Sequence, residues 1–230
     1  MLADPSTYAI EDFIPFTAEV YLRLVERQNT TMWPAHFVAL AAGLAAMACA
    51  WRGWGRGRPL AVLLAASWGW VAWSFHVRVF SELTWAANVF AGAFALQAVL
   101  TLAAAWLGGF NNEPHRKPGA VRILGVALAA AGLVGFPLLA LRNEHGWAAA
   151  ETFAMTPDPT VVVTLALLLL AARPLAYLAL LPIPLLWCAI ASVIEWTLDT
   201  PFAWIMPAVA SVLAITVIAE AWVAWRTKRQ

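Results

Sequence analysis

Two histidines and two carboxylates lie at similar depths in long apolar segments and together could bind a cation. His36 lies three residues after Trp33, and His76 closes the next apolar segment, while Asp158 opens a later segment and Glu195 ends the one after it. Imidazole and carboxylate groups suit a zinc-like or iron-like ion. We therefore predict a metal cluster of His36, His76 and Asp158 in one outward-opening cavity. No H-x-x-x-H or H-E-x-x-H spacing is present, so interfacial histidines bonded to backbone or water are the alternative.

Four polar residues mark a candidate substrate or ion pathway: Asp158, Glu195, Gln97 and Glu220. A carboxylate within a membrane segment, such as Glu220, is a functional candidate by default, although its side chain could instead reach towards water or Arg226. Gln97 lies near the middle of its segment, where an interhelical hydrogen bond is the simpler interpretation.

The segment Thr156-Pro157-Asp158-Pro159-Thr160 is the most unusual motif. Two prolines fix φ and remove two donors, so the segment cannot lie inside a helix. Asp158 could cap the helix that follows, or the segment could be a re-entrant turn that lines a pathway. Pro182 and Pro184 predict a second break, within the sixth apolar segment.

The composition shows which kind of protein must position these groups. Of 230 residues, 63% are hydrophobic and 12% are charged, and the mean hydropathy is +0.74. These values exclude an ordinary soluble domain, a disordered chain and a nucleic-acid-binding protein. The two cysteines, Cys49 and Cys188, lie in apolar runs and cannot form a disulfide framework. The sequence therefore predicts an all-α, multi-pass membrane helix bundle.

Seven apolar segments are predicted to cross the bilayer, because about 20 apolar residues are needed to span it. Arg173-Pro174 separates the fifth from the sixth. The N-terminal 30 residues precede the bundle of residues 31–230 and contain an amphipathic stretch, Thr17–Gln28, which predicts a helix on the membrane surface. The predicted spans are Trp33–Trp51, Leu60–Val77, Leu83–Leu107, Ala120–Leu141, Val161–Ala172, Leu175–Leu198 and Ala203–Trp225.

The charges predict the orientation of the bundle. If the segments alternate across the membrane, the N-terminal side carries four of the 14 basic residues and eleven of the 13 acidic ones. The positive-inside rule then places the N-terminus outside and the C-terminus in the cytoplasm. An acidic outer vestibule of this kind would concentrate cations or amines. The alternative is that acids merely occupy the outer loops, since they contribute little to orientation.

Several ordered motifs resemble one family. They are Asn29-x-x-x-Trp33-Pro34, His76-x-x-x-Phe80-Ser81, Ala86-Ala87-x-x-Phe90, the 156–160 motif, Ile183-Pro184-Leu185-Leu186-Trp187-Cys188 and Asp199. Together they resemble the bacterial membrane proteins called domain of unknown function 6064. The chain departs from that pattern at Thr84-Trp85 and at Asp158, where Asn-Pro and a cysteine are usual. The resemblance implies a multi-pass protein of the bacterial inner membrane, and it implies no activity.

The leading functional prediction is transport or permeation of a small solute or cation through the acidic vestibule. The alternatives are a membrane-embedded metal-dependent enzyme that uses His36, His76 and Asp158, and an accessory or scaffold subunit. An enzyme is the less favoured class. No cofactor is expected, with a divalent metal as the alternative. The expected partners are the lipid bilayer and a small solute or cation, with no nucleic acid, and a second copy or another membrane subunit remains open.

Overall fold

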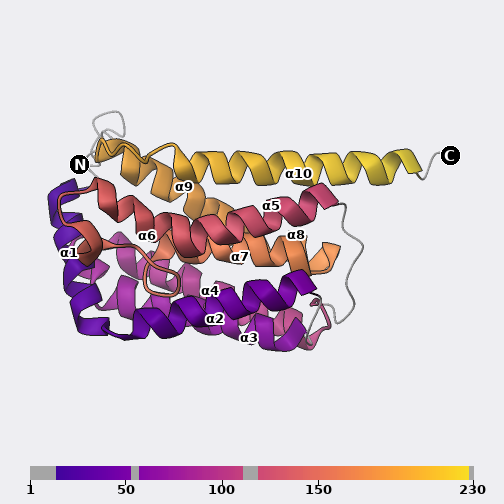
Figure 1. Ribbon diagram of the computed structural model, residues 1–230, viewed down its shortest axis with the longest axis horizontal. Helices are drawn as coiled ribbons and strands as arrows, with labels where there is room; N and C mark the ends of the chain where they lie inside the picture. The colour runs from indigo at the N-terminus through magenta and orange to yellow at the C-terminus, as the bar shows by residue number, and fades with distance from the viewer. Residues whose placement is uncertain (1–13, 53–56, 111–118, 228–230) are drawn as a thin grey trace, which may run out of the picture.

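The computed structural model describes residues 14–52, 57–110 and 119–227, and these residues form a helical bundle (Figure 1). Residues 1–13 of the predicted N-terminal segment, and the basic residues Arg56, Arg116, Lys117, Lys228 and Arg229, lie outside the described residues. The α-helices are α1 (Ala18–Met32), α2 (Ala35–Arg52), α3 (Gly57–Val71), α4 (Ala86–Trp106), α5 (Gly119–Ala130), α6 (Phe136–Leu139), α7 (Pro157–Ala171), α8 (Pro174–Leu180), α9 (Pro182–Thr197) and α10 (Ile205–Thr227).

Short π and 3-10 segments extend several of these helices. The π segment η3 (Ala72–Val77) continues α3, and η5 (Ala131–Gly135) joins α5 to α6. The 3-10 segments are η4 (Phe80–Glu82), η6 (Ala140–Arg142) and η7 (Gly146–Ala149). Within the part of the chain that the structure describes, five helical segments are long and apolar enough to cross a membrane: Ala35–Arg52, Gly57–Glu82, Ala86–Trp106, Gly119–Arg142 and Pro174–Thr197.

The other two predicted spans correspond to shorter apolar helices, Pro157–Ala171 and Ile205–Glu220. The fold is therefore a membrane helix bundle, while seven spans and their orientation stay predictions. The separation of the fifth and sixth spans is confirmed. The chain leaves α7 at Ala172, Arg173 N–H donates to Gly109 O at 2.8 Å, and α8 starts at Pro174.

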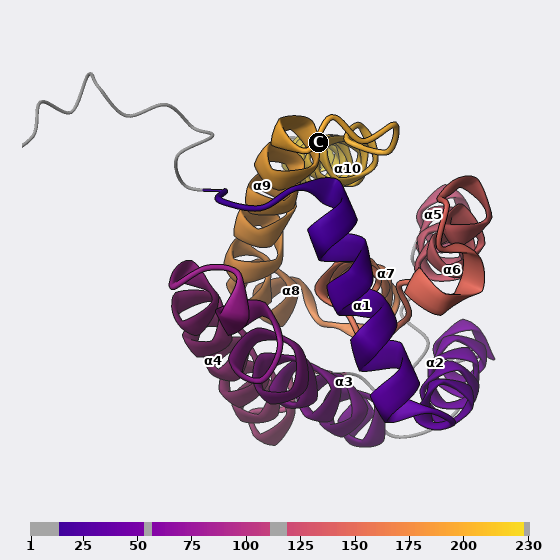
Figure 2. The ribbon, with the colours of Figure 1, turned by 90° about the vertical axis from the view of Figure 1, so that its left-hand side faces the viewer.

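Helix α7 forms the centre of the bundle, and the longer helices surround it (Figure 2). Every residue from Pro157 to Leu169 is buried. A 15-residue helix is about 22 Å long, shorter than the roughly 30 Å hydrocarbon layer. Because protein encloses it, α7 need not match the thickness of the bilayer.

Threonines on one side of α7 attach it to its surroundings. Thr160 Oγ1 accepts from Ala154 N–H at 2.8 Å, and Thr164 Oγ1 accepts from the Trp68 indole N–H at 2.8 Å. Both hydroxyls also donate to carbonyls one turn earlier, of Thr156 and Thr160, at 2.7 Å. Polar groups buried in an apolar interior need partners, and these bonds hold α7 to α3 and to the preceding loop.

Pro182 and Pro184 break the sixth span into α8 and α9, as predicted. The Leu180 carbonyl would normally accept from the N–H four residues later, but that residue is Pro184, which has none. Gln97 Nε2 of α4 donates to this carbonyl at 3.0 Å. Gln97 is fully buried, and its bond confirms the interhelical interpretation. The Gln97 amide thus takes the place of the backbone N–H that Pro184 lacks.

The amphipathic segment forms α1, which lies across one end of the bundle (Figures 1 and 2). Thr17 is its N-cap and accepts from Val20 N–H at 3.4 Å. The apolar face points into the bundle, because Leu24 and Val25 are buried in the common core. The helix was predicted correctly, but in the structure its apolar face rests on the other helices.

We expect Leu24→Glu to detach α1 and lower the thermal midpoint of the protein in detergent. Leu24 is 5% exposed. Its burial is worth about 1.5–3 kcal/mol, and a buried unpaired charge adds a further penalty. Val20→Glu is the matched control, because Val20 is 42% exposed on the same helix. If both variants melt at the same temperature, the apolar face of α1 does not hold it in place.

Candidate functional site

A cavity of about 290 Å³ lies beneath α1. It is lined by three carboxylates that are buried or half-buried, and also by the exposed side chains of Arg142, Glu144 and Asp199. Glu151 comes from the loop before α7, Asp158 from the first turn of α7, and Glu195 from the last turn of α9. Antiparallel packing of α7 and α9 brings the last two together. Apart from these groups, the walls are largely apolar; they include Leu22, Phe136, Leu139, Leu198, Phe202, Ile205 and Met206.

Among the described residues, one side-chain donor bonds to each of the carboxylates of Glu151, Asp158 and Glu195. The Tyr21 hydroxyl of α1 donates to Glu151 Oε1 at 2.6 Å, and the Trp187 indole N–H donates to Asp158 Oδ1 at 2.7 Å. The Thr200 hydroxyl donates to Glu195 Oε2. One donor for each carboxylate leaves acceptor capacity unused, since an ionised carboxylate has about four lone-pair sites. The cavity can therefore supply oxygen acceptors to a bound donor.

Burial and, after it, repulsion by neighbouring carboxylates raise the pKa of Glu151. Burial is the main cause, and the nearby charges of Asp158 and Glu195 raise its pKa further, well above the usual range. The bond from Tyr21 acts in the opposite direction and is too weak to offset them. A bound cation would relieve this repulsion, because an opposite charge favours the ionised carboxylate.

Asp158 does not cap α7, contrary to one interpretation of its motif. The N-cap residue is Thr156, with φ −124° and ψ 158°, and Asp158 lies one residue inside the helix after Pro157. Its carboxylate instead bonds to Trp187. The other interpretation of this motif, a re-entrant turn, is also wrong, because α7 starts at Pro157 and continues to Ala171.

The predicted cluster of His36, His76 and Asp158 does not assemble. His36 lines a different cavity, where its Nε2 lies 3.0 Å from Asn29 Oδ1. His76 is fully buried and lines none of the cavities described. Over residues 14–52, 57–110 and 119–227, no group of three His, Cys, Asp or Glu residues could hold a metal. The three residues were expected to face one cavity because of their predicted depth, but they lie in different surroundings.

Aromatic rings surround His76, which lies in the π segment η3. Its ring centroid is 4.6 Å from that of Phe94 and 5.2 Å from that of Trp187. Phe75, Phe80 and Phe90 complete the enclosure. Trp187 thus contacts His76 with its ring and Asp158 with its N–H, so it links this histidine to one carboxylate of the cavity.

The predicted pathway residues divide into two groups. Asp158 and Glu195 line the cavity beneath α1. Gln97 bonds to Leu180 O, and Glu220 lies on α10 near Tyr177, so neither lines that cavity. Glu151 and Tyr21 were not predicted as site residues from the sequence. The one sequence feature that pointed to Glu151 was the excess of acidic residues at this end of the bundle. For Tyr21 it was the position of an aromatic residue on the amphipathic helix.

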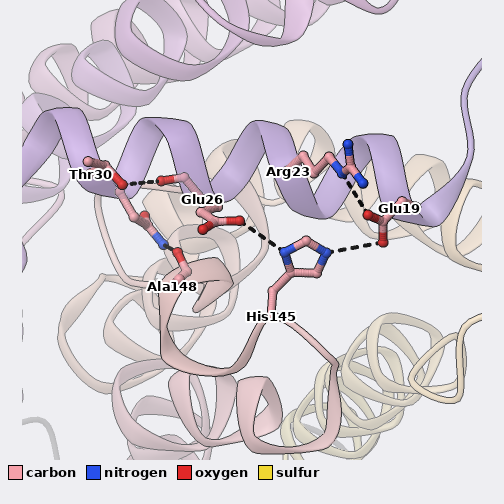
Figure 3. Close-up of polar contacts among 7 residues, drawn as sticks. Glu19, Arg23, Glu26, Thr30, His145 and Ala148 are labelled. Carbon is pink, nitrogen blue, oxygen red and sulfur yellow. Dashed lines mark hydrogen bonds and ion pairs between the residues drawn. The ribbon is translucent and has the colours of Figure 1, made fainter.

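A polar clamp holds α1 to the loop that carries Glu151 (Figure 3). His145 lies between two carboxylates of α1, with Nδ1 2.9 Å from Glu26 and Nε2 3.1 Å from Glu19. Arg23 Nε also lies 2.6 Å from Glu19. Asn29 Nδ2 donates to the carbonyls of Ala148 and Ala150, both at 2.9 Å. The clamp fixes α1 above the acidic cavity.

We expect His145 to stabilise α1 at acidic pH and to lose this effect as the pH rises. Hydrogen bonds to Glu19 and then to Glu26 raise the pKa of His145 above 6.5. A raised pKa in the folded state contributes stability that is complete below about 6.5, the unfolded value, and is lost as the pH passes the folded value. His145→Gln should therefore speed hydrogen exchange in α1 at pH 6 relative to wild type, and match wild type at alkaline pH. A pH-independent difference would show that the charge of His145 is irrelevant.

The comparisons place the chain in a family without assigning it an activity. A family model described as a family of unknown function, DUF6064, matches residues 18–229. This match covers nearly the whole bundle, so the chain belongs to that family, as its motifs indicated. No curated protein and no solved structure matches the chain.

Proposed function

We propose that the cavity beneath α1 binds small organic cations of the amine or guanidine type and that the protein carries them across the membrane. The observation that supports this proposal is the convergence of Glu151, Asp158 and Glu195 on one largely apolar cavity. Three carboxylates with unused acceptor sites favour a cation that brings N–H donors. The apolar walls favour a carbon-containing cation over a hydrated metal ion.

The position of the cavity favours uptake. It lies at the end of the bundle where Glu82, Glu144 and Asp199 also lie, whereas Arg52, Arg58 and Arg122 lie at the opposite end. The positive-inside rule assigns the acidic end to the outer face. An acidic entrance concentrates cations before they bind, and the cavity is their first site.

Movement of α9 relative to α8 is the proposed route past the cavity. Beyond Asp158 the interior is filled by Trp187, His76 and Phe94, which pack ring against ring. The broken helix at Leu181 and Pro182 is the natural hinge, because a proline break lacks the backbone bonds that make a helix rigid. Trp187 and Glu195 both lie on α9. Movement of α9 would therefore displace the Trp187 ring and the Glu195 carboxylate at the same time.

The test is uptake of radiolabelled guanidinium into proteoliposomes that contain the full-length protein. Guanidinium is permanently charged, and its planar donors fit carboxylates. Urea has nearly the same shape without the charge and is the matched control. We expect guanidinium uptake well above that of protein-free liposomes, and urea uptake at the protein-free level. Equal uptake of both solutes would contradict a charge-selective site.

A further inference from the structure

A second and larger cavity, of about 710 Å³, lies between α2 and the span that contains η5 and α6. It shares no lining residue with the acidic cavity. Its walls are apolar, with Phe37, Leu40, Leu133, Pro137 and Phe153. Among the described residues that line it, the polar side chains besides the Trp33 and Trp147 indoles are uncharged or imidazole: Asn29, Thr30, His36 and Thr152. A volume of this size fits small-molecule sites, and the absence of Asp, Glu, Lys and Arg from its lining favours an uncharged ligand.

Two buried polar atoms on residues of this cavity have no hydrogen-bond partner among the described residues. They are His36 Nδ1 and Thr152 Oγ1. Buried polar groups in folded proteins are nearly always paired. Two unpaired groups on residues of one otherwise apolar cavity therefore indicate where a polar part of a ligand would bind once the side chains that cover these atoms move aside.

The surrounding bonds determine what His36 offers to a ligand. Asn29 Nδ2 donates to two carbonyls, so the amide oxygen of Asn29 is the atom that faces His36 Nε2. Because that oxygen can only accept, Nε2 must carry the proton. In the neutral imidazole Nδ1 is then an acceptor. The Thr152 hydroxyl can donate, so together they match a hydroxyl group, which both donates and accepts.

The surroundings of the cavity indicate that its ligand comes from the bilayer. His36, Phe37 and Leu40 belong to α2, and Leu133 and Pro137 belong to the facing span. Only 17% of α2 is buried, against 33% or more for each of the other four long spans, so most of α2 faces away from the bundle. Trp33, Phe37 and Trp147 are 64%, 60% and 58% exposed at the cavity. Indole rings prefer the headgroup level of a membrane.

We propose that this cavity binds an uncharged membrane lipid that has a free hydroxyl, of the diacylglycerol type, with the hydroxyl held by His36 and Thr152 and an acyl chain along Leu40 and Leu133. The lining of this cavity calls for a headgroup that is uncharged and that carries one O–H group. This site is independent of the proposed cation transport, because the two cavities have separate walls.

Photo-crosslinking of the full-length protein in nanodiscs tests the proposal. The first probe is diacylglycerol with a diazirine on one acyl chain, and the second has the same chains but an acetylated hydroxyl. The third is phosphatidylglycerol, which carries a charge. We expect diacylglycerol to label Phe37, Leu40 and Leu133 about five-fold more than either other probe, the ratio that roughly one hydrogen bond supplies. The lipid-facing Val89 and Leu96 of α4, 61% and 52% exposed, should be labelled equally by all three.

Two variants separate the roles of the headgroup and the chain. His36→Leu should reduce diacylglycerol labelling of the cavity to the level of the acetylated probe, because the acceptor is gone. Leu40→Trp should fill the cavity and reduce labelling by every probe. Equal cavity labelling by the three probes in the wild-type protein would overturn the proposal, and this comparison needs no variant that might misfold. Stronger labelling by phosphatidylglycerol would likewise overturn it.

Discussion

Gly132→Ala is expected to destabilise the bundle by about 1–3 kcal/mol, the usual penalty of overpacking a core. A Cβ at this position would lie 2.6 Å from Val163 Cγ2 and 3.1 Å from the Pro159 carbonyl oxygen. Neither neighbour can move easily, because valine is stiff at χ1 and Pro159 belongs to the backbone at the start of α7. The strain would therefore displace the turn that carries Asp158.

Gly135→Ala is the matched control for this effect. It lies in the same π segment, and its Cβ would meet only Ala131 Cβ, at 3.7 Å. Alanine is also a better helix former than glycine by up to about 1 kcal/mol, so this variant should be neutral or slightly stabilised. Thermal midpoints in one detergent compare the two variants. If Gly132→Ala melts no earlier than Gly135→Ala, the close approach of η5 to α7 is not required.

The second prediction concerns the charge of Asp158. Asp158→Asn should lower guanidinium uptake by up to roughly 1,000-fold, because a unit charge about 4 Å from a cation is worth roughly 4 kcal/mol at a protein-like dielectric constant. The fold should persist, since the amide oxygen of asparagine can still accept from Trp187. The measurement is the initial rate of uptake into proteoliposomes, with thermal stability determined on the same preparation.

Asp199→Asn is the control for Asp158→Asn. Asp199 lines the same cavity but is exposed at the turn after α9, with φ 52°. Asparagine tolerates this backbone conformation as well as aspartate does, and an exposed charge contributes little because water screens it. Uptake by this variant should stay within about two-fold of wild type. If the two variants lose equal activity, the effect is general surface charge and the buried carboxylate has no special role.

The fold could be predicted well from the sequence because each element has a strong local signal. The apolar segments identified the spans, the Arg173-Pro174 pair marked the turn between α7 and α8, and Pro182 with Pro184 marked the break before α9. The faces of α1 were also predicted, from spacing alone. These features depend on neighbours along the chain, which a sequence displays directly.

The site could be predicted only in part, because sequence gives the depth of a residue in a span but little about the direction in which it points. Asp158 and Glu195 were selected, and the antiparallel packing of α7 and α9 brings them together. His36 and His76 were predicted to have a similar depth, yet one lines a lateral cavity and the other is enclosed by rings. Rotation about a helix axis depends on partners distant in the sequence, and η3 alters it further at His76.

Glu151 could not be singled out because its neighbours in sequence say nothing of its surroundings. It lies in a loop, where an acid is ordinarily solvated. It is drawn into the cavity because α1 covers that loop and Tyr21 donates to it. The contact joins residues 130 positions apart. Only the docking of α1, a tertiary event, makes this carboxylate part of the site.

Equilibrium binding of radiolabelled guanidinium to the purified protein, measured from acidic to alkaline pH, tests the cation site most directly. Because burial and its acidic neighbours raise the pKa of Glu151, protons should compete with the cation, and affinity should rise with pH as Glu151 ionises. Glu151→Gln should weaken binding at alkaline pH and flatten the profile, whereas Glu82→Gln, at the same end but outside the cavity, should leave it unchanged. Urea should not compete. Absence of guanidinium binding, or binding that is independent of pH and displaced by urea, would contradict a carboxylate-lined cation site beneath α1.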